Sequence, residues 1–258
     1  MIRVIQPAYR ADLQEQAVMA NSMRDLLLEE ALAHDIALSQ NQVKQFLSYL
    51  ALIQRWQKTA VRLVGSDEPA KLVGVHVADA FSIYQCINRL KGRKLVDIGS
   101  GAGFPGLYLK IVEPTWQLTL LEASAKKTAF LAKAKTALRL EGLEIVRGRA
   151  EELAHDCRMR EQFDLATLRA VANLPKSIET GLPFVQVGGF LVVARGKSSR
   201  GDVETARDLG RRLGAERVIV YAGSLGDAPL RGSIMVFTKT KRAGRVSPGS
   251  AARTGEVC

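Results

Sequence analysis

The second half of the chain alternates short apolar runs with longer amphipathic stretches, a pattern typical of α/β proteins. The patterns predict helices at 104–112, 125–140 and 202–213, the last of them rich in charged residues. Strands that alternate with helices form a parallel sheet with right-handed crossovers. The last two strands follow each other directly, so we expect a Rossmann-like sheet that ends in a hairpin. Its seven strands are expected at 94–98, 117–122, 143–148, 163–169, 188–195, 216–221 and 233–238.

A different pattern precedes the first strand and predicts a small helical region. Apolar residues recur at steps of three and four from Val43 to Trp56, which gives a helix one apolar side. Ser39 and Gln42 stand at the spacing of a capping box before this helix, and a further helix is expected over 73–82. The outer side of the longer helix carries basic residues, namely Lys44, Arg55 and Lys58.

These patterns divide the chain into four parts. We expect a helical appendage at 21–92 packed on a sheet domain at 93–240. Residues 1–20 are expected to be poorly ordered. The segment 241–258 combines Gly, Ser and Pro with basic residues, which predicts a flexible tail that serves solubility or contacts phosphate.

A glycine-rich turn follows the first predicted strand. Gly99, Gly101 and Gly103 occupy alternate positions, where the backbone can turn sharply and approach a ligand closely. Pro105 then stands where a first helical turn is expected. A strand, a glycine turn and a helix N-terminus together form the ligand cradle of an open α/β sheet.

Two ligand classes compete for this turn. Residues 101–106 match the dinucleotide pattern G-x-G-x-x-G, which is a weak signal alone. The alternative pattern is hydrophobic-Asp-hydrophobic-Gly-x-Gly-x-Gly, usual in S-adenosylmethionine (SAM) methyltransferases, and its register agrees with Gly99 as the first glycine after the strand. Asp97 suits a ligand with a sulfonium and an ammonium group, and it would repel a pyrophosphate. A turn without a ligand is the third possibility.

The ends of the next two strands supply further candidates. Glu122 ends the second strand about 20 residues after Gly99, the position from which a carboxylate accepts both hydroxyls of a ribose. Enzymes that bind NAD use the same device, so Glu122 supports an adenosine ligand without choosing between the classes. The turn after the third strand lies over the adenine in such sheets, so the Ala150 backbone and Glu151 are candidates to contact the base.

Basic residues end the fourth and fifth strands, where the ligand crevice of an open sheet lies. Arg169 is expected to contact the methionine end of the cofactor or a substrate phosphate, or else to pair with Asp97 or Glu151. Arg195 and Lys197 are expected at the mouth of the crevice.

His76 and Asp79 lie three residues apart, so a helix places them on one face. They are predicted either to line the rim of a substrate pocket or to form a histidine satisfied by a neighbouring carboxylate within a packing site.

The charge and composition of the chain limit its possible binding partners. The formal net charge of +11 favours an acidic partner, of which nucleic acid is the commonest and a membrane surface the rival. No apolar run approaches the roughly 20 residues of a membrane span, and no signal-peptide core is present, so we expect a cytoplasmic protein without membrane contact. The cysteines, Cys86, Cys157 and Cys258, are odd in number and lack metal-binding spacing, so we expect plain thiols and no metal site.

These motifs resemble those of the ribosomal RNA small subunit methyltransferase G family, also called glucose-inhibited division protein B. The resemblance covers about residues 40 to 240. The run Asp-x-Gly-x-Gly-x-Gly-x-Pro-Gly is quite specific to that family. The resemblance as a whole is carried by Trp56, His76-Val-Ala-Asp79, Val96-Asp-Ile-Gly-Ser-Gly-Ala-Gly-Phe-Pro-Gly106, Leu120-Leu-Glu122, Lys126-Lys127, Arg149-Ala-Glu-Glu152 and Arg169-Ala.

The resemblance implies methylation at N7 of one guanine in 16S ribosomal RNA, with SAM as cofactor and with free RNA or the small ribosomal subunit as substrate. By position it implies SAM contacts at Gly99, Phe104, Ala150, Glu151 and Arg169, with Glu122 on the ribose. The chain departs from the family pattern on the side expected to meet RNA. It has Arg62-Leu-Val64 where Asn-Leu-Thr is common, and Arg195-Gly196 where Lys-Gly is usual.

Guanine N7 carries an in-plane lone pair, so its attack on a sulfonium methyl requires no general base and no catalytic acid or base is predicted. Arg195, Lys197 and His76 are the residues expected to meet the RNA, and the chain is expected to act as a monomer. Two other functions stay open. The scarcity of aromatics (6%) favours a methyltransferase for a small molecule or protein, and residues 101–106 leave room for an NAD-dependent oxidoreductase.

Overall fold

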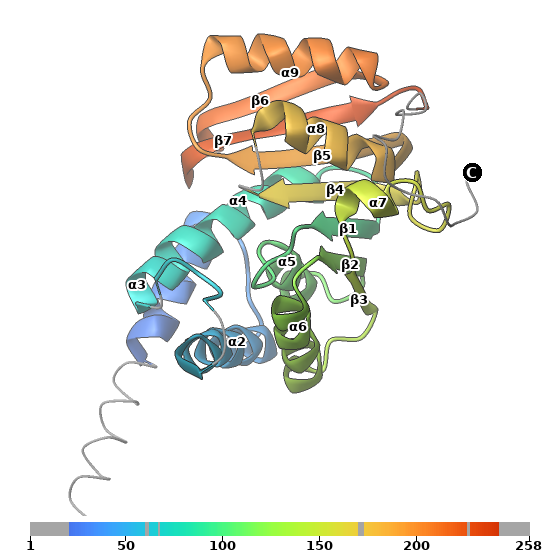
Figure 1. The fold of residues 1–258 in the computed structure, drawn as a ribbon. Coiled ribbons are helices and arrows are strands. Elements are labelled where there is room, and N and C mark those ends of the chain that lie inside the picture. The colour runs from blue at the N-terminus through green and yellow to red at the C-terminus, as the bar shows by residue number, and fades with distance from the viewer. Residues whose placement is uncertain (1–20, 60–61, 67, 170–172, 226–227, 243–258) are drawn as a thin grey trace, which may run out of the picture.

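The computed structural model describes most of the chain (Figure 1). The predictions for residues 1–20 and for 243–258 of the tail fall outside the described residues. The described ranges are 21–59, 62–66, 68–169, 173–225 and 228–242.

The described residues form one α/β unit. After a helix over 21–33, the helices are α2 (Gln40–Thr59), α3 (Pro69–Lys71), the π-helix η1 (Leu72–Val77), α4 (Ala78–Asn88), α5 (Gly106–Val112), α6 (Ala125–Leu138), α7 (Ala150–Leu153), α8 (Leu174–Gly181), the 3₁₀-helix η2 (Leu182–Phe184) and α9 (Arg200–Arg212). The strands are β1 (Lys94–Ile98), β2 (Gln117–Glu122), β3 (Leu143–Arg147), β4 (Phe163–Arg169), β5 (Val185–Arg195), β6 (Ala215–Leu225) and β7 (Ala228–Lys239). Within the described ranges, every helix is too short or too polar to cross a bilayer.

The strands form a seven-stranded sheet in the order β3-β2-β1-β4-β5-β7-β6 over the described residues. The first five strands are parallel and β7 is antiparallel to both β5 and β6, which confirms the predicted terminal hairpin. The last three strands are longer than predicted. The glycine pair at 188–189 marks a register shift between β4 and β5 rather than the start of a strand, so β5 begins at Val185.

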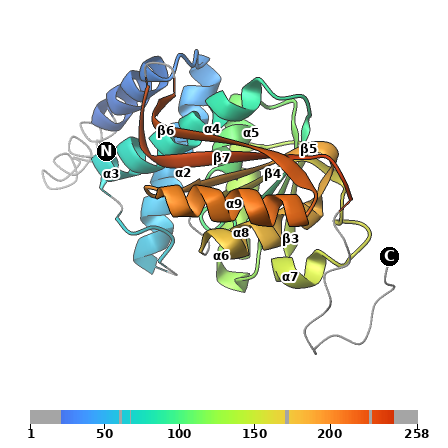
Figure 2. The ribbon, with the colours of Figure 1, turned by 90° about the horizontal axis from the view of Figure 1, so that it is seen from above.

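Helices cover both faces of the sheet (Figures 1 and 2). On one face, α2, α4, α5 and α6 enclose a core that takes alternate strand residues such as Leu95 and Leu165. On the other, α7, α8 and α9 pack on the intervening residues, such as Val96 and Ala166. Because β1 to β5 run parallel, their C-terminal ends lie at one edge of the sheet, where ligands bind in open α/β sheets.

The helix α2 packs on the sheet domain as the apolar spacing predicted. Val43, Phe46 and Ile53 are buried in the shared core, whereas Lys44, Arg55 and Lys58 are exposed. The Ser39–Gln42 capping box is present, with the Ser39 N–H donating to Gln42 Oε1 (2.8 Å) and the Gln42 N–H to Ser39 Oγ (3.3 Å). The Gln42 amide also donates to the carbonyls that end α5, Ile111 O and Val112 O (2.9 Å each), which fixes α2 against the helix that follows the glycine turn.

Candidate functional site

The glycine turn leaves the end of β1 and is held against β2. Gly99, Gly101 and Gly103 have φ angles of +71°, +58° and +97°, a left-handed region that favours glycine. The N–H groups of Gly99 and Ser100 both donate to the carbonyl of Leu121 in β2, at 2.8 and 3.1 Å. The turn is therefore fixed by backbone conformation and backbone bonding.

The glycines of the turn serve two different purposes. A Cβ on Gly103 would lie 2.5 Å from Leu107 Cδ1, and one on Gly106 would lie 2.3 Å from Leu120 Cδ2, so these positions are bare because the protein itself packs there. A Cβ on Gly101 would meet only the Gly99 carbonyl, at 3.8 Å. Gly101 thus faces open space, as expected of the position that a ligand approaches.

Asp97 supports the turn from inside the protein. The side chain is only 1% exposed, with Oδ1 accepting from Thr167 Oγ (2.9 Å) and Oδ2 from the Gly106 N–H (3.1 Å). Burial raises the pKa of its carboxyl to about 6, and the hydrogen bonds from Thr167 and Gly106 oppose that rise. Asp97 therefore links β1, β4 and α5, and its expected contact with a ligand stays a prediction.

Glu122 lies beside the glycine turn, as its spacing predicted. Its Oε2 accepts from the Gly101 N–H (2.9 Å) and its Oε1 from the Ser124 N–H (2.8 Å). An ionised carboxylate offers about four acceptor sites. Glu122 therefore retains acceptor capacity for the hydroxyls of a ribose placed over Gly101.

Ala150 and Glu151 begin α7, just after β3. The Gly148 N–H donates to the carbonyl of Glu122 (3.2 Å), so this turn lies next to the second acid. Glu151 is exposed and pairs with Lys176 of α8 at 3.3 Å. Its own backbone N–H, and then Lys176, lower the pKa of its carboxyl.

Arg169, at the end of β4, organises a cluster of side chains from distant segments. Its Nε and Nη2 donate to Asp79 Oδ2 at 3.1 and 2.6 Å, and its Nη1 lies 2.9 Å from His76 Nδ1. The acid that pairs with Arg169 is therefore Asp79, and the predicted pairing with Asp97 or Glu151 is wrong. The two residues from one helical face do come together, but through the arginine between them.

His76 is held neutral within this cluster. Burial first, and then the neighbouring Arg169 charge, lower the pKa of its imidazole to about 4. Since Nδ1 faces an arginine donor, the single ring proton belongs on Nε2. The imidazole is also stacked on Phe104, with ring centroids 4.6 Å apart and planes at 23°.

Phe104 joins the cluster to the glycine turn. It directly follows Gly103, is 7% exposed, and has the Arg169 guanidinium 5.9 Å from its ring centroid. Tyr49 of α2 lies 6.0 Å from the same ring and donates its hydroxyl proton to the Ala102 carbonyl. The helical region thus braces the turn and the cluster together.

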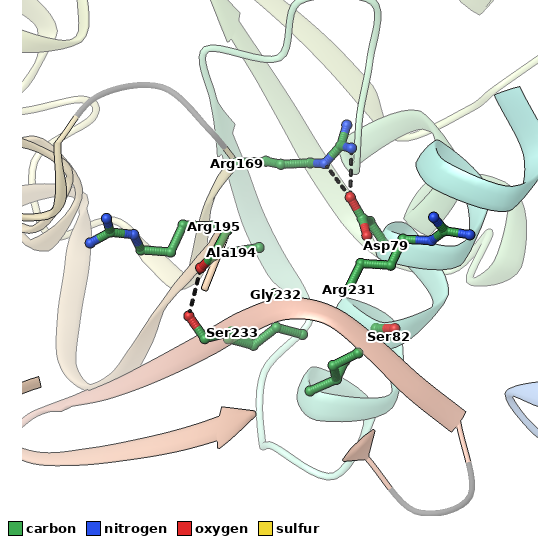
Figure 3. A pocket seen from close by; sticks show the side chains of 11 residues that line it. Asp79, Ser82, Arg169, Ala194, Arg195, Arg231, Gly232 and Ser233 are labelled. Carbon is green, nitrogen blue, oxygen red and sulfur yellow. Dashed lines mark hydrogen bonds and ion pairs between the residues drawn. The ribbon is translucent and has the colours of Figure 1, made fainter. Parts of the chain in front are cut away.

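A cavity of about 140 Å³ opens beside the cluster (Figure 3). Arg195 borders it but pairs with Asp202 of α9 at 3.5 Å, and Figure 3 shows its side chain directed away from Asp79. Lys197 is exposed in the loop after β5. The lining residues are Asp79, Ser82, Arg169, Ala194, Arg195, Gly196, Leu230, Arg231, Gly232, Ser233 and Ile234.

Sequence reasoning missed Arg231 and underrated Asp79. Arg231 precedes the apolar run of β7, so no motif marked it, and it reaches the cavity only because β7 pairs with β5, with Ser233 opposite Arg195. Asp79 carried a signal, its spacing from His76, but its partner Arg169 lies 90 residues away in the sequence.

Solved structures with this architecture are methyltransferases and related enzymes that share the fold. A SAM-dependent O-methyltransferase from Thermotoga maritima matches with a TM-score of 0.50 and 15% identity, covering 77% of this chain and 73% of that one. The branched-chain polyamine synthase from Thermus thermophilus matches with a TM-score of 0.54 and 14% identity, covering 77% and 65%. These likenesses show a Rossmann-like fold that this chain shares with SAM-dependent methyltransferases.

The family follows from sequence comparison. Residues 42–227 match the family model of rRNA small subunit methyltransferase G. The ribosomal RNA small subunit methyltransferase G of Caldanaerobacter subterraneus is 41% identical over 173 residues, covering 67% of this chain and 72% of the relative. That of Clostridium botulinum strain 657 is 31% identical over 221 residues, covering 85% and 92%. The chain belongs to the rRNA small subunit methyltransferase G family, which excludes the oxidoreductase interpretation of residues 101–106.

The residues present fit SAM. Open space lies over Gly101, and Glu122 beside it has acceptor sites left for ribose hydroxyls. Arg169 uses three N–H donors on Asp79 and His76, which leaves donors free on a guanidinium that has five. Those donors suit the carboxylate of a methionine moiety.

Proposed function

We propose that this chain transfers the methyl group of SAM to N7 of a guanine in 16S ribosomal RNA. Family membership supports an RNA substrate. The cavity supports a nucleotide there, since three arginines line it: Arg169, Arg195 and Arg231. The proposal includes action as a monomer in the cytoplasm, on free RNA or on the small subunit.

Bound SAM supplies an electrophilic methyl group on a sulfonium. The part of the chain is to hold the reactants, because N7 attacks through its own lone pair and no proton has to leave first. The state of His76 is consistent with a reaction that needs no general base, since its Nδ1 faces Arg169 and its pKa near 4 keeps the ring uncharged. Alignment of the reacting atoms alone is worth up to about 7 to 11 kcal/mol in intramolecular reactions.

The site residues have separate proposed roles. Glu122 binds the ribose, the Gly99–Gly101 backbone approaches the cofactor, and Ala150 with Glu151 contacts the adenine. Arg169 binds the methionine end, and Phe104 and His76 form the wall between cofactor and substrate, which their 4.6 Å stack supports. Arg195 and Lys197 contact RNA phosphates around the target nucleotide, because both follow β5 at the ligand edge of the sheet.

Labelled methyl transfer tests the function. We expect label from SAM to enter either deproteinised 16S ribosomal RNA or assembled small subunits, and chemical cleavage at N7-methylguanine to map one position. Both substrates should come from cells that lack this activity, so that the site is free. Absence of label from both RNA forms would overturn the proposal and favour a small-molecule or protein substrate.

A further inference from the structure

The cavity beside the Arg169 cluster is built from four segments that meet only in the folded chain. Asp79 comes from α4, Arg169 from β4, Arg195 from β5 and Arg231 from β7. The glycine turn and Glu122 do not line it. Of its lining residues, only Arg169 has a proposed cofactor contact, so the rest of the cavity is available to the substrate nucleotide.

Asp79 offers the cavity an unused acceptor. Arginine and carboxylate often pair as two parallel forks, with one N–H on each oxygen. Here both Arg169 donors converge on Oδ2, and Oδ1 accepts no hydrogen bond from any residue that the structure describes. The Asp79 side chain is 29% exposed, so it is partly shielded from water yet reachable from the cavity. The pairing orients the carboxylate while leaving one oxygen available.

The rim of the same cavity is cationic. Arg231 is exposed, and its guanidinium lies over Gly74 of η1, where its charge opposes the rise that burial causes in the pKa of Glu30. Figure 3 shows its side chain on the same side of the cavity as Asp79 and Arg169. A shielded carboxylate with a guanidinium at the entrance complements a ligand that has hydrogen-bond donors at its inner end and an anion outside. A guanine nucleotide has that arrangement, with N1–H and N2–H₂ on one edge and a phosphate on the sugar.

We propose that this cavity receives the extruded target guanine and that Asp79 Oδ1 accepts from its N1–H and N2–H₂ groups. This inference rests on the proposed function. Enzymes that modify a base draw it out of its stack and read its Watson–Crick edge in the pocket. That edge lies across the base from N7, so the nucleophile is left free. Adenine presents an acceptor at N1, which faces the carboxylate unfavourably. Arg231 contacts the phosphate of the same nucleotide.

Inosine provides the sharpest probe, because it keeps N7 and N1–H and lacks only the N2 amino group. Small subunits are assembled with guanine or inosine at the mapped methylation site, and the dissociation constant of each is measured with the wild-type protein and with Asp79→Asn. We expect the wild type to bind the guanine form at least about 10-fold more tightly, the contribution of one hydrogen bond to a charged acceptor. Asp79→Asn should bring the two forms close to equal affinity.

The matched control is Asp202→Asn, which makes the same chemical change at the acid that pairs with Arg195. It should retain the guanine-to-inosine ratio of the wild type. Affinity for S-adenosylhomocysteine, measured on each variant, reports whether the cofactor side is intact. A purely structural role for Asp79 would weaken both RNA forms equally and leave their ratio unchanged.

Two results would overturn the inference. One is equal binding of guanine and inosine by the wild type, a measurement that requires no variant and stands even if Asp79→Asn fails to fold. The other is a wild-type ratio in Asp79→Asn protein that still binds S-adenosylhomocysteine. Failure of the proposed function looks different, because then no methyl label enters the RNA at all.

Discussion

The glycine turn and the Arg169 cluster meet at Phe104 but are assembled in different ways. The turn is one continuous segment whose shape is set by positive φ angles and by backbone bonds to β2. The cluster takes His76 from η1, Asp79 from α4 and Arg169 from β4, and its shape is set by side-chain contacts. A cofactor that all methyltransferases of this fold bind suits a site built from one continuous segment. A substrate that differs between families suits a site assembled from several segments.

Burial shifts the pKa values of one buried group in each region in opposite directions. Burial raises the pKa of Asp97 under the turn and lowers that of His76 in the cluster, so each group is driven toward its neutral form. The consequences for stability have opposite signs, and this gives the largest effect by which the comparison can be tested.

Unfolding free energies at two pH values should separate the regions. Asp97, with a pKa of about 6 against 3.8 when unfolded, stabilises the fold below pH 4 and loses that contribution as the pH rises through 6. His76, with a pKa of about 4 against 6.5 when unfolded, stabilises above pH 6.5 and loses that contribution as the pH falls through 4. In the wild type the two largely cancel.

Each substitution should expose the group that remains. Between pH 7 and pH 4.5, His76→Gln should gain about 2 to 3 kcal/mol relative to wild type, and Asp97→Asn should lose about the same, as followed by urea denaturation. Using differences from wild type cancels the other titrating groups. Parallel pH profiles for the three proteins would show that neither group is perturbed in the fold.

The glycines of the turn give the next largest effect. Gly106→Ala places a Cβ 2.3 Å from Leu120 Cδ2 and 2.8 Å from Asp97 Oδ2, and this overpacking should destabilise the protein by about 2 to 3 kcal/mol. In Gly101→Ala the new Cβ lies in open space, so the loss of unfolding free energy should stay near the 1 kcal/mol that a left-handed alanine costs. The affinity for SAM should fall, because the Cβ occupies space that the ligand approaches. Denaturant midpoints with and without SAM would measure both. Equal destabilisation by the two variants would contradict the division of the glycines.

The same contrast explains how far the sequence could be interpreted. The strand bounds of β1, β2 and β4 and the position of Glu122 beside the turn were predictable, because local spacing and backbone rules determine them. The partner of Arg169 was not, since pairing with Asp79 depends on how α4 crosses the strand ends. The bracing contacts of Asp97 could not be predicted for a similar reason. Its position in the motif was clear, but only the fold shows that Thr167 and Gly106 donate to its two oxygens.

Cofactor binding gives an intermediate effect that belongs to the turn alone. Glu122→Ala should weaken SAM by about 1 to 3 kcal/mol, because charged hydrogen bonds to the ribose are lost. Glu122→Gln is the milder companion, since its amide oxygen can still accept from the Gly101 N–H. Calorimetric titration with SAM would rank the three proteins. Unchanged affinity in the alanine variant would mean that the ribose does not lie against β2.

The smallest effect lies on the substrate side, where Lys197→Ala should weaken RNA binding by about 1 kcal/mol or less and leave SAM binding unchanged. A single phosphate contact releases about 0.7 to 0.9 counterion, so the slope of log affinity against log salt should become shallower by that amount. Lys241→Ala is the matched control. Lys241 is also exposed, but it follows the C-terminal end of β7, which lies at the other edge of the sheet from the end of β5, and it pairs with Glu216 at 2.8 Å. If both lysine variants change the salt slope equally, the RNA is attracted by the charge of the whole surface and does not bind preferentially beside Lys197.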